Sequence, residues 1–247
     1  MTKPMIGIIG GAGVAASIEF LSRLEQIVTK EGAFRDQQHP ELVMYQATQV
    51  PSRSMFLEGR GPSFIPGYIE AGKKLKGAGA SFAAMACNTA HYAIDEISAG
   101  CGLPFVNMIE ENFKAALKLT PAAVKIGVLC SDGTRKAAIY EQTAKRLGIK
   151  AEIIQPDEKQ QAEVTLGICN IKKAYHRTKP LIDPERPAKL FFDAGMNLAS
   201  KGAQVIILGC TEIPIDLPQM AKLPIPVVDS LDALAYACLR EFRRLAS

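Results

Sequence analysis

The sequence has 247 residues, of which 48% are hydrophobic and 22% charged, so it can form one large folded domain or two small ones. Its net charge is only +4, and its basic residues are scattered rather than interleaved with aromatic residues, which argues against binding to nucleic acid. No apolar stretch is long enough to span a bilayer, and no signal peptide is evident. We therefore expect a cytoplasmic protein whose six cysteines are reduced thiols.

Apolar runs alternate with amphipathic segments along the whole chain. The apolar runs predict strands, and apolar residues at three- and four-residue steps predict helices. Strands are expected at residues 4–9, 42–47, 82–85, 104–106, 125–129, 151–154, 203–208 and 225–228. Helices are expected at residues 14–29, 68–76, 91–97, 110–119, 135–147, 157–175, 190–200 and 231–245.

This alternation predicts an α/β fold with parallel sheets. The pattern restarts near Pro121, which suggests two pseudo-symmetric parallel-sheet α/β domains with the active site in the cleft between them. We expect the first domain to span residues 1–120 and the second to span residues 121–224. The final segment, residues 225–247, is expected to pack back on the first domain.

A glycine-rich turn follows the first expected strand, with the sequence GGAG at residues 10–13. Strand, glycine turn and helix together are typical of dinucleotide-binding proteins, but the third glycine of that motif is missing here and so is the lysine of a phosphate loop. We favour the simpler interpretation that these glycines let the backbone approach a small ligand closely.

Two cysteines follow apolar runs at comparable places in the two expected halves. The first lies in the sequence ACNTAH at residues 86–91, and the second in the sequence GCTEIP at residues 209–214. The ends of parallel strands are where ligands bind in such folds. The two thiols are therefore candidates for one shared site.

A thiol can act as a nucleophile, a metal ligand or an acid/base group. A cysteine nucleophile needs a histidine base, and His91 lies four residues after Cys87, a spacing that also suits a metal. A structural zinc needs four ligands, however, and the chain has no second short-spaced Cys/His pair. The simple alternative for His91 is a surface residue or a local hydrogen bond.

Two thiols acting as acid and base explain more of the pattern. Inverting a stereocentre next to a carboxylate requires removal of a proton from one face and delivery of a proton to the other. A thiolate at a helix N-terminus has a lowered pKa, and we expect both cysteine loops to lead into helices. Backbone amides and the side chains of Asn88, Thr89 and Thr211 are placed to stabilise the developing negative charge.

Both cysteine sequences resemble those of the aspartate/glutamate racemase family, the amino-acid racemases that use no pyridoxal phosphate. The resemblance covers essentially the whole chain. It implies two pseudo-symmetric α/β domains, a site between them, often a homodimer, and no cofactor or metal. It also implies that Cys87 and Cys210 are the catalytic pair. Glu212 is similar to the residue of the aspartate racemase branch, because glutamate racemases usually have histidine there.

The resemblance extends to further substrate-binding candidates. The loop PSRS at residues 51–54 resembles the loop whose arginine holds a substrate carboxylate, which nominates Arg53. The helix around residues 168–172 resembles the one that carries a substrate-binding lysine, which nominates Lys172, although Lys173 is its neighbour. The full set of expected substrate-binding residues is Gly11, Ser17, Arg53, Asn88, Thr89, Thr134, Lys172, Thr211 and Glu212.

The sequence also departs from the family pattern. Ser52 is found where the family commonly has aspartate, and Ser17 is found where its amino-terminal motif has threonine. Cys130 adds a third thiol where a small residue is usual, whereas Cys169 and Cys238 are expected to be small buried helix residues. These departures affect which side chain is bound more than they affect the chemistry.

We therefore predict a racemase that acts on an acidic amino acid, most readily aspartate. The alternatives within the fold are glutamate or hydantoin racemisation and maleate isomerase-like chemistry on a small carboxylic acid. From a different class, the alternative is a binding protein that has kept the site and lost turnover.

Overall fold

The computed structural model describes residues 3–175, 186–214 and 220–247. The strands are β1 (Ile6–Gly10), β2 (Leu42–Gln46), β3 (Phe82–Met85), β4 (Lys125–Cys130), β5 (Glu152–Ile154), β6 (Val205–Gly209) and β7 (Val227–Asp229). The longer helices are α1 (Val14–Lys30), α3 (Ile65–Gly77), α4 (Ile94–Cys101), α5 (Met108–Leu119), α7 (Ile139–Arg146), α8 (Glu158–Tyr175), α9 (Arg186–Ser200) and α10 (Ser230–Ala246). Short helices are η1 (Asp36–Gln38), α2 (Arg53–Leu57), η2 (Asn88–Ala93), α6 (Asp132–Lys136) and η4 (Met220–Lys222).

The chain forms two compact units, one from Met1–Glu111 and Leu231–Ser247 and the other from Asn112–Ser230. Each unit has its own parallel sheet, with strand order β2-β1-β3 in the first and β5-β4-β6-β7 in the second. The prediction of two α/β regions with parallel sheets is therefore confirmed. Among the described residues, no helix combines the length and the apolar character needed to cross a membrane.

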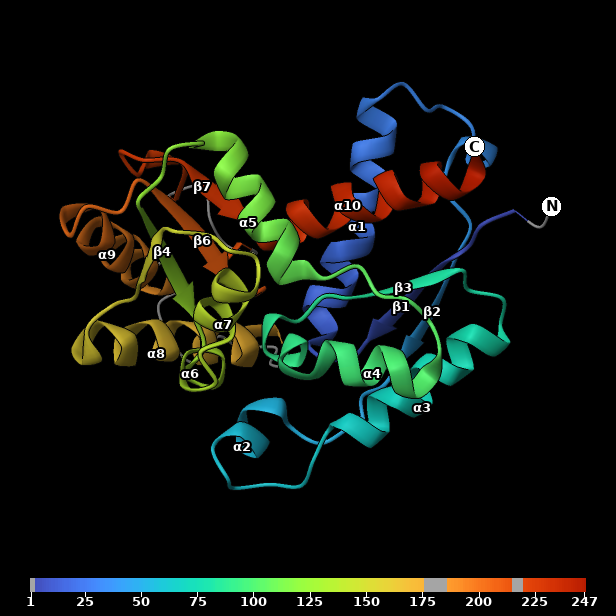
Figure 1. Ribbon diagram of the computed structural model, residues 1–247, viewed down its shortest axis with the longest axis horizontal. Helices are drawn as coiled ribbons and strands as arrows, with labels where there is room; N and C mark the ends of the chain where they lie inside the picture. Colours follow the sequence, from blue (N-terminus) through green and yellow to red (C-terminus); the bar gives the residue numbers. More distant parts are fainter. Residues whose placement is uncertain (1–2, 176–185, 215–219) are drawn as a thin grey trace. The chain divides into compact units, whose positions relative to one another are not determined.

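The sheet of the first unit is covered by helices on both faces (Figure 1). Side chains of α3 and α4 pack with Ile9 and Met85 on one face. Side chains of α1 and α10 pack with Ile6 and Ile8 on the other face. Because successive side chains of a strand point to opposite faces, a strand buried on both sides is apolar throughout, as β1 and β3 are.

The second unit buries β4 and β6 in the same way. Helices α8 and α9 pack their apolar sides on one face of its sheet, around Phe191 and Leu208. The burial of Phe191 depends on Gly167 of α8, because a Cβ atom added there would lie 2.8 Å from the phenylalanine ring. Close packing of α8 on α9 therefore requires a glycine at this helix crossing.

Several expected elements differ in the structure. The helix expected at residues 135–147 is divided into α6 and α7, because Ala138 between them adopts a left-handed φ of 46°. Residues 104–106 form a single bridge between Phe105 and Ala83 instead of a strand. The strand expected at residues 225–228 pairs with β6 in the second sheet, whereas the sequence analysis assigned it to the first domain.

Candidate active site

The two cysteines occupy the same register position in their respective sheets. In the first unit, Ile6 of β1 pairs with Phe82 of β3, and Cys87 comes five residues after Phe82. In the second unit, Ile126 of β4 pairs with Val205 of β6, and Cys210 comes five residues after Val205. Each thiol therefore lies just beyond the carboxyl end of the equivalent strand, which is the ligand-binding edge of a parallel sheet.

The Cys87 loop is fixed by its own histidine. The Nδ1 atom of His91 lies 2.8 Å from the carbonyl oxygen of Cys87, and because a carbonyl only accepts, Nδ1 carries the proton. His91 is buried, and burial lowers the pKa of its imidazole below the usual range although the Cys87 carbonyl acts in the opposite direction. His91 thus makes a local hydrogen bond, one of the two alternatives above, but in the core and not at the surface.

Asn88 and Thr89 follow Cys87 and are both buried. They begin the 3-10 helix η2, and the regular helix α4 begins only at Ile94. The Cys87 loop therefore leads into a helix as expected, but the first part of the helix expected at residues 91–97 is 3-10 and its regular part runs from Ile94 to Cys101.

The glycine turn after β1 is held by a side chain of α1. The Ser17 hydroxyl accepts a hydrogen bond from the amide of Gly11 at 3.0 Å and donates one to the carbonyl of Gly13 at 2.8 Å. Gly11 has a φ of +82°, and an added Cβ would lie 2.9 Å from the amide nitrogen of Thr48. Gly11 thus allows close approach of the segment that follows β2, and the approach of a ligand to this turn stays a prediction.

Arg53 is the first residue of α2 and is anchored to the glycine turn. Its Nη2 atom donates a hydrogen bond to the carbonyl of Ala12. The helix begins at Ser52, whose side chain accepts a hydrogen bond from the amide of Met55 at 3.4 Å. The cap places the half-buried Arg53 beside the apolar cluster that also contains Cys87.

Cys210 has a carboxylate neighbour from its own loop. The Cys210 thiol donates a hydrogen bond to Oε2 of Glu212 at 3.0 Å, and the hydroxyl of Thr211 lies 3.4 Å from the same oxygen. The other oxygen, Oε1, forms an ion pair with Nζ of Lys172 on α8 at 3.3 Å. The structure therefore brings four predicted residues of the second unit together, three of them buried and Lys172 half exposed.

Burial and this carboxylate raise the pKa of the Cys210 thiol well above its usual range, and the Lys172 ammonium acts in the opposite direction. The expectation of a thiol whose pKa is lowered by a helix end is therefore wrong for Cys210. The residues that follow it, 211–213, form a turn and not a regular helix. The side chain of Lys173 lies outside the described residues.

Cys130 is the last residue of β4 and pairs with Gly209 of β6, and Thr134 lies in α6, just after the strand. Thr134 is buried, and its hydroxyl lies 3.1 Å from that of Ser131, the residue that caps α6. Cys130 is buried as well, and burial raises the pKa of its thiol. Its carbonyl accepts a hydrogen bond from the side chain of Gln161 at 3.0 Å.

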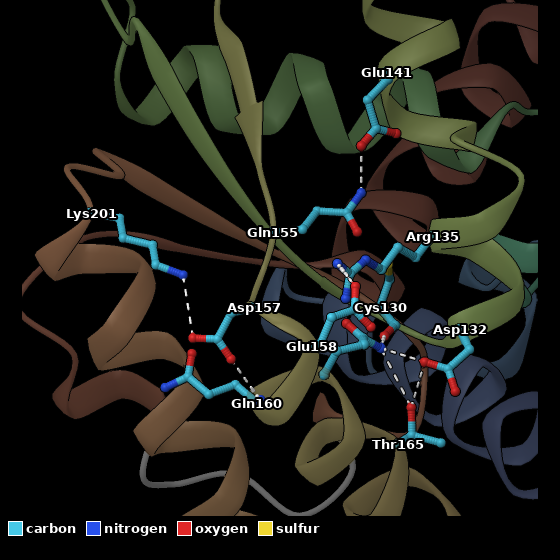
Figure 2. Close-up of polar contacts among 11 residues, drawn as sticks. Cys130, Asp132, Arg135, Glu141, Gln155, Asp157, Glu158, Gln160, Thr165 and Lys201 are labelled. Atoms are coloured by element: carbon cyan, nitrogen blue, oxygen red, sulfur yellow. Dashed lines mark hydrogen bonds and ion pairs between the residues drawn. The ribbon is translucent and has the colours of Figure 1, made fainter.

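The same Gln161 amide also reaches Asp132 at 2.9 Å, and the Thr165 hydroxyl donates to that carboxylate at 2.8 Å (Figure 2). These contacts tie the end of β4 to α8, the helix that carries Lys172. Cys169, three residues before Lys172, is exposed, which corrects the expectation that it is buried, whereas Cys238 is buried as expected.

Sequence reasoning missed two buried tyrosines that adjoin the cysteine loops. Tyr140 contacts Gly209 so closely that a Cβ atom there would lie 2.9 Å from its ring, and its hydroxyl accepts from the Asn112 amide at 2.8 Å. Tyr68 lies in the apolar cluster of Cys87. Nothing in the sequence marks either tyrosine, because each lies on an apolar helix face like any core residue.

These units define a class of protein: a parallel α/β protein with a buried cysteine after the equivalent strand of each sheet. The chain matches the family described as Asp/Glu/Hydantoin racemase over residues 9–238, and it belongs to that family. Among the residues that the structure describes, no group of three or more His, Cys, Asp or Glu side chains could hold a metal ion.

The most informative relatives agree on this family. The broad specificity amino-acid racemase RacX of Bacillus subtilis is 28% identical over 234 residues, which cover 94% of this chain and 95% of the relative. A solved aspartate racemase homologue from Pyrococcus horikoshii has a TM-score of 0.73 at 26% identity, covering 98% of this chain and 100% of that one. The Picrophilus torridus aspartate racemase has a TM-score of 0.79 at 24% identity, covering 98% and 99%, and supports the fold.

Proposed function

We propose that this protein is a cofactor-independent racemase of an acidic amino acid, most readily aspartate, in which Cys87 and Cys210 act on opposite faces of one substrate molecule. The observation that carries the proposal is the shared register position of the two buried thiols, five residues after equivalent strand residues. Two chemically alike groups at equivalent places suit a reaction whose two directions are mirror images.

The surroundings of Cys210 support one order of steps in this proposal. Its raised pKa and its hydrogen bond to Glu212 keep Cys210 a thiol, so it is the proton donor at the start of one direction. Cys87 then removes the α-proton, the electron pair of the broken C–H bond moves into the substrate carboxylate, and Cys210 delivers its proton to the opposite face. The sulfurs exchange roles in the reverse direction, so no net proton or electron is consumed.

The remaining polar groups have binding roles in this proposal. Arg53 and Lys172 bind the carboxylates of the substrate, because Arg53 contacts the glycine turn of the first unit and Lys172 lies beside the Cys210 loop of the second. Asn88, Thr89 and Thr211 stabilise the negative charge that develops on the α-carboxylate. A site between two domains and a homodimer follow from the resemblance, a cytoplasmic location is an expectation from the sequence alone, and all three remain predictions.

The test is α-proton exchange of L-aspartate in deuterated water, followed by NMR with chiral analysis and no added cofactor. We expect loss of the α-proton signal, appearance of D-aspartate, and loss of both in Cys87→Ser and in Cys210→Ser. Cys169→Ser is the matched control, because this thiol is exposed and outside the proposed site. Exchange that persists in either active-site variant would contradict the two-base mechanism.

Substrate range is the second outcome of the same assay. The relative RacX is named as a broad specificity racemase, so glutamate and neutral amino acids belong in the panel. Turnover of many side chains at similar kcat/KM would replace aspartate specificity with broad specificity. Absence of exchange with every substrate would favour the binding-protein alternative.

A further inference from the structure

The Tyr68 side chain is buried without a hydrogen bond. Its exposed fraction is 0%, and its hydroxyl has no hydrogen-bond partner among the residues that the structure describes. Burying a hydroxyl without a partner is unfavourable, so such a group requires an explanation. The comparison within the chain is Tyr140, which is equally buried but bonded to Asn112 at 2.8 Å.

A row of three contacting aromatic rings connects Tyr68 to the helix that carries Arg53. Phe56 of α2 packs edge-on against Phe64 with ring centroids 5.5 Å apart, and Phe64 packs against Tyr68 at 5.8 Å. Phe56 lies three residues after Arg53, on the same short helix. These ring contacts therefore fix the position of α2, and with it Arg53, relative to Tyr68.

The Arg53 guanidinium lies near the Tyr68 hydroxyl, close enough that both its charge and a side-chain interaction with it lower the pKa of the phenol, although the hydroxyl has no partner in full hydrogen-bond geometry among the described residues. Burial raises the pKa of Tyr68, the Arg53 cation lowers it, and Cys87 adds to the increase. Tyr68 therefore stays a neutral phenol whose oxygen can accept a hydrogen bond. Arg53 has five N–H donors, and one of them is directed to the Ala12 carbonyl.

We propose that Tyr68 is a positioning residue for Arg53: its hydroxyl oxygen accepts a hydrogen bond from the guanidinium when Arg53 binds a substrate carboxylate. This inference rests on the proposed function for the substrate class. The hydroxyl acts through Arg53, because its own surface is covered. Carboxylate binding would give the buried oxygen its partner and hold the guanidinium in a single orientation.

The test compares Tyr68→Phe with the wild-type protein in two measurements. Binding of succinate, a four-carbon dicarboxylate that lacks the amino group, is measured by calorimetry, and racemisation of aspartate by its KM and kcat. We expect the Kd of succinate and the KM to rise about tenfold, the size of one charge-assisted hydrogen bond. We expect kcat to change less than twofold and the melting temperature to stay equal or rise.

Tyr140→Phe is the matched control for folding, because it removes a bonded hydroxyl from an equally buried tyrosine. Its melting temperature should fall. A double-mutant cycle gives the second control: in an Arg53→Ala background, Tyr68→Phe should cause no further loss of succinate binding. An undiminished loss in that background would show that Tyr68 does not act through Arg53.

The outcomes separate this inference from the proposed function. Racemisation with an unchanged KM in Tyr68→Phe would overturn the inference and leave the function standing. Weaker succinate binding that depends on Arg53, in a protein that racemises nothing, would support the inference and refute the function. A wild-type protein that does not bind succinate, or a Tyr68→Phe variant that melts lower as Tyr140→Phe does, would overturn the inference.

Discussion

Cys87 and Cys210 share a strand position but not a chemical environment. The Cys210 loop brings a carboxylate, Glu212, within 3.0 Å of the thiol, whereas the residue at the matching position of the first loop is Thr89. The Cys87 loop is instead fixed through its backbone by His91. The comparison teaches that the sheet register sets where a thiol lies, while the side chains of each loop set its chemistry.

The largest expected effect on stability concerns the residues that immediately precede the two cysteines. Gly209→Ala should lower the free energy of unfolding by about 1–3 kcal/mol, because the new methyl group would overlap the fixed ring of Tyr140. The matching residue of the first loop is Ala86, and Ala86→Gly, which introduces no overlap, should cost about 1 kcal/mol through chain entropy and the loss of one buried methyl group. Equal losses in urea unfolding would contradict a specific contact at Gly209.

The second prediction concerns the stability of the first loop in acid. Burial lowers the pKa of His91, so below about pH 6.5 the unfolded chain binds a proton that the folded chain does not. Stability should therefore fall as pH drops below that value, by up to about 1.4 kcal/mol per pH unit, until the folded imidazole is protonated. Melting temperatures from pH 4 to 8 measure this loss.

The variant His91→Gln should remove this part of the acid dependence, and His39→Gln is the control that should keep it. An identical pH profile in His91→Gln and the wild-type protein would show that another group causes the loss.

The third prediction addresses the carboxylate that distinguishes the second loop. Glu212→Gln should lower the pH at which Cys210 becomes reactive by about one unit, because a neutral amide no longer opposes the thiolate. Alkylation by iodoacetamide, followed peptide by peptide with mass spectrometry, measures the midpoint. Cys130 in the same digest is the control, since burial is the main cause of its raised pKa. A midpoint that moves up would reverse the assigned role of Glu212.

The smallest expected effect concerns Lys172, which forms an ion pair with the other oxygen of Glu212. Lys172→Met should change the free energy of unfolding by less than about 1 kcal/mol, because a half-exposed ion pair is weak. It should nevertheless shift the alkylation midpoint of Cys210 upward, opposite to Glu212→Gln, since Lys172 favours the thiolate. Shifts of the same sign in both variants would mean that Lys172 and Glu212 do not act on Cys210 as a pair.

Much of this organisation could be predicted from the sequence, because buried strands and helices have recognisable patterns of apolar residues. Phe82–Met85 and Val205–Gly209 are apolar on both faces, which marked them as inner strands and located the two cysteines at their ends. The Lys172–Glu212 contact, by contrast, joins residues 40 positions apart, and no local pattern encodes it. The left-handed Ala138 was equally unpredictable, because alanine is a strong helix former and only tertiary packing breaks the helix there.

The contact between Asn112 and Ser230 has a consequence for the architecture of the chain. These residues are the first and last of the second unit, and the Asn112 amide donates to the Ser230 hydroxyl at 3.3 Å. The polypeptide therefore enters and leaves that unit at neighbouring points, as in a domain inserted into another domain. Because its two ends lie close together, we expect the second unit, residues 112–230, to be exchangeable between relatives without added linker residues.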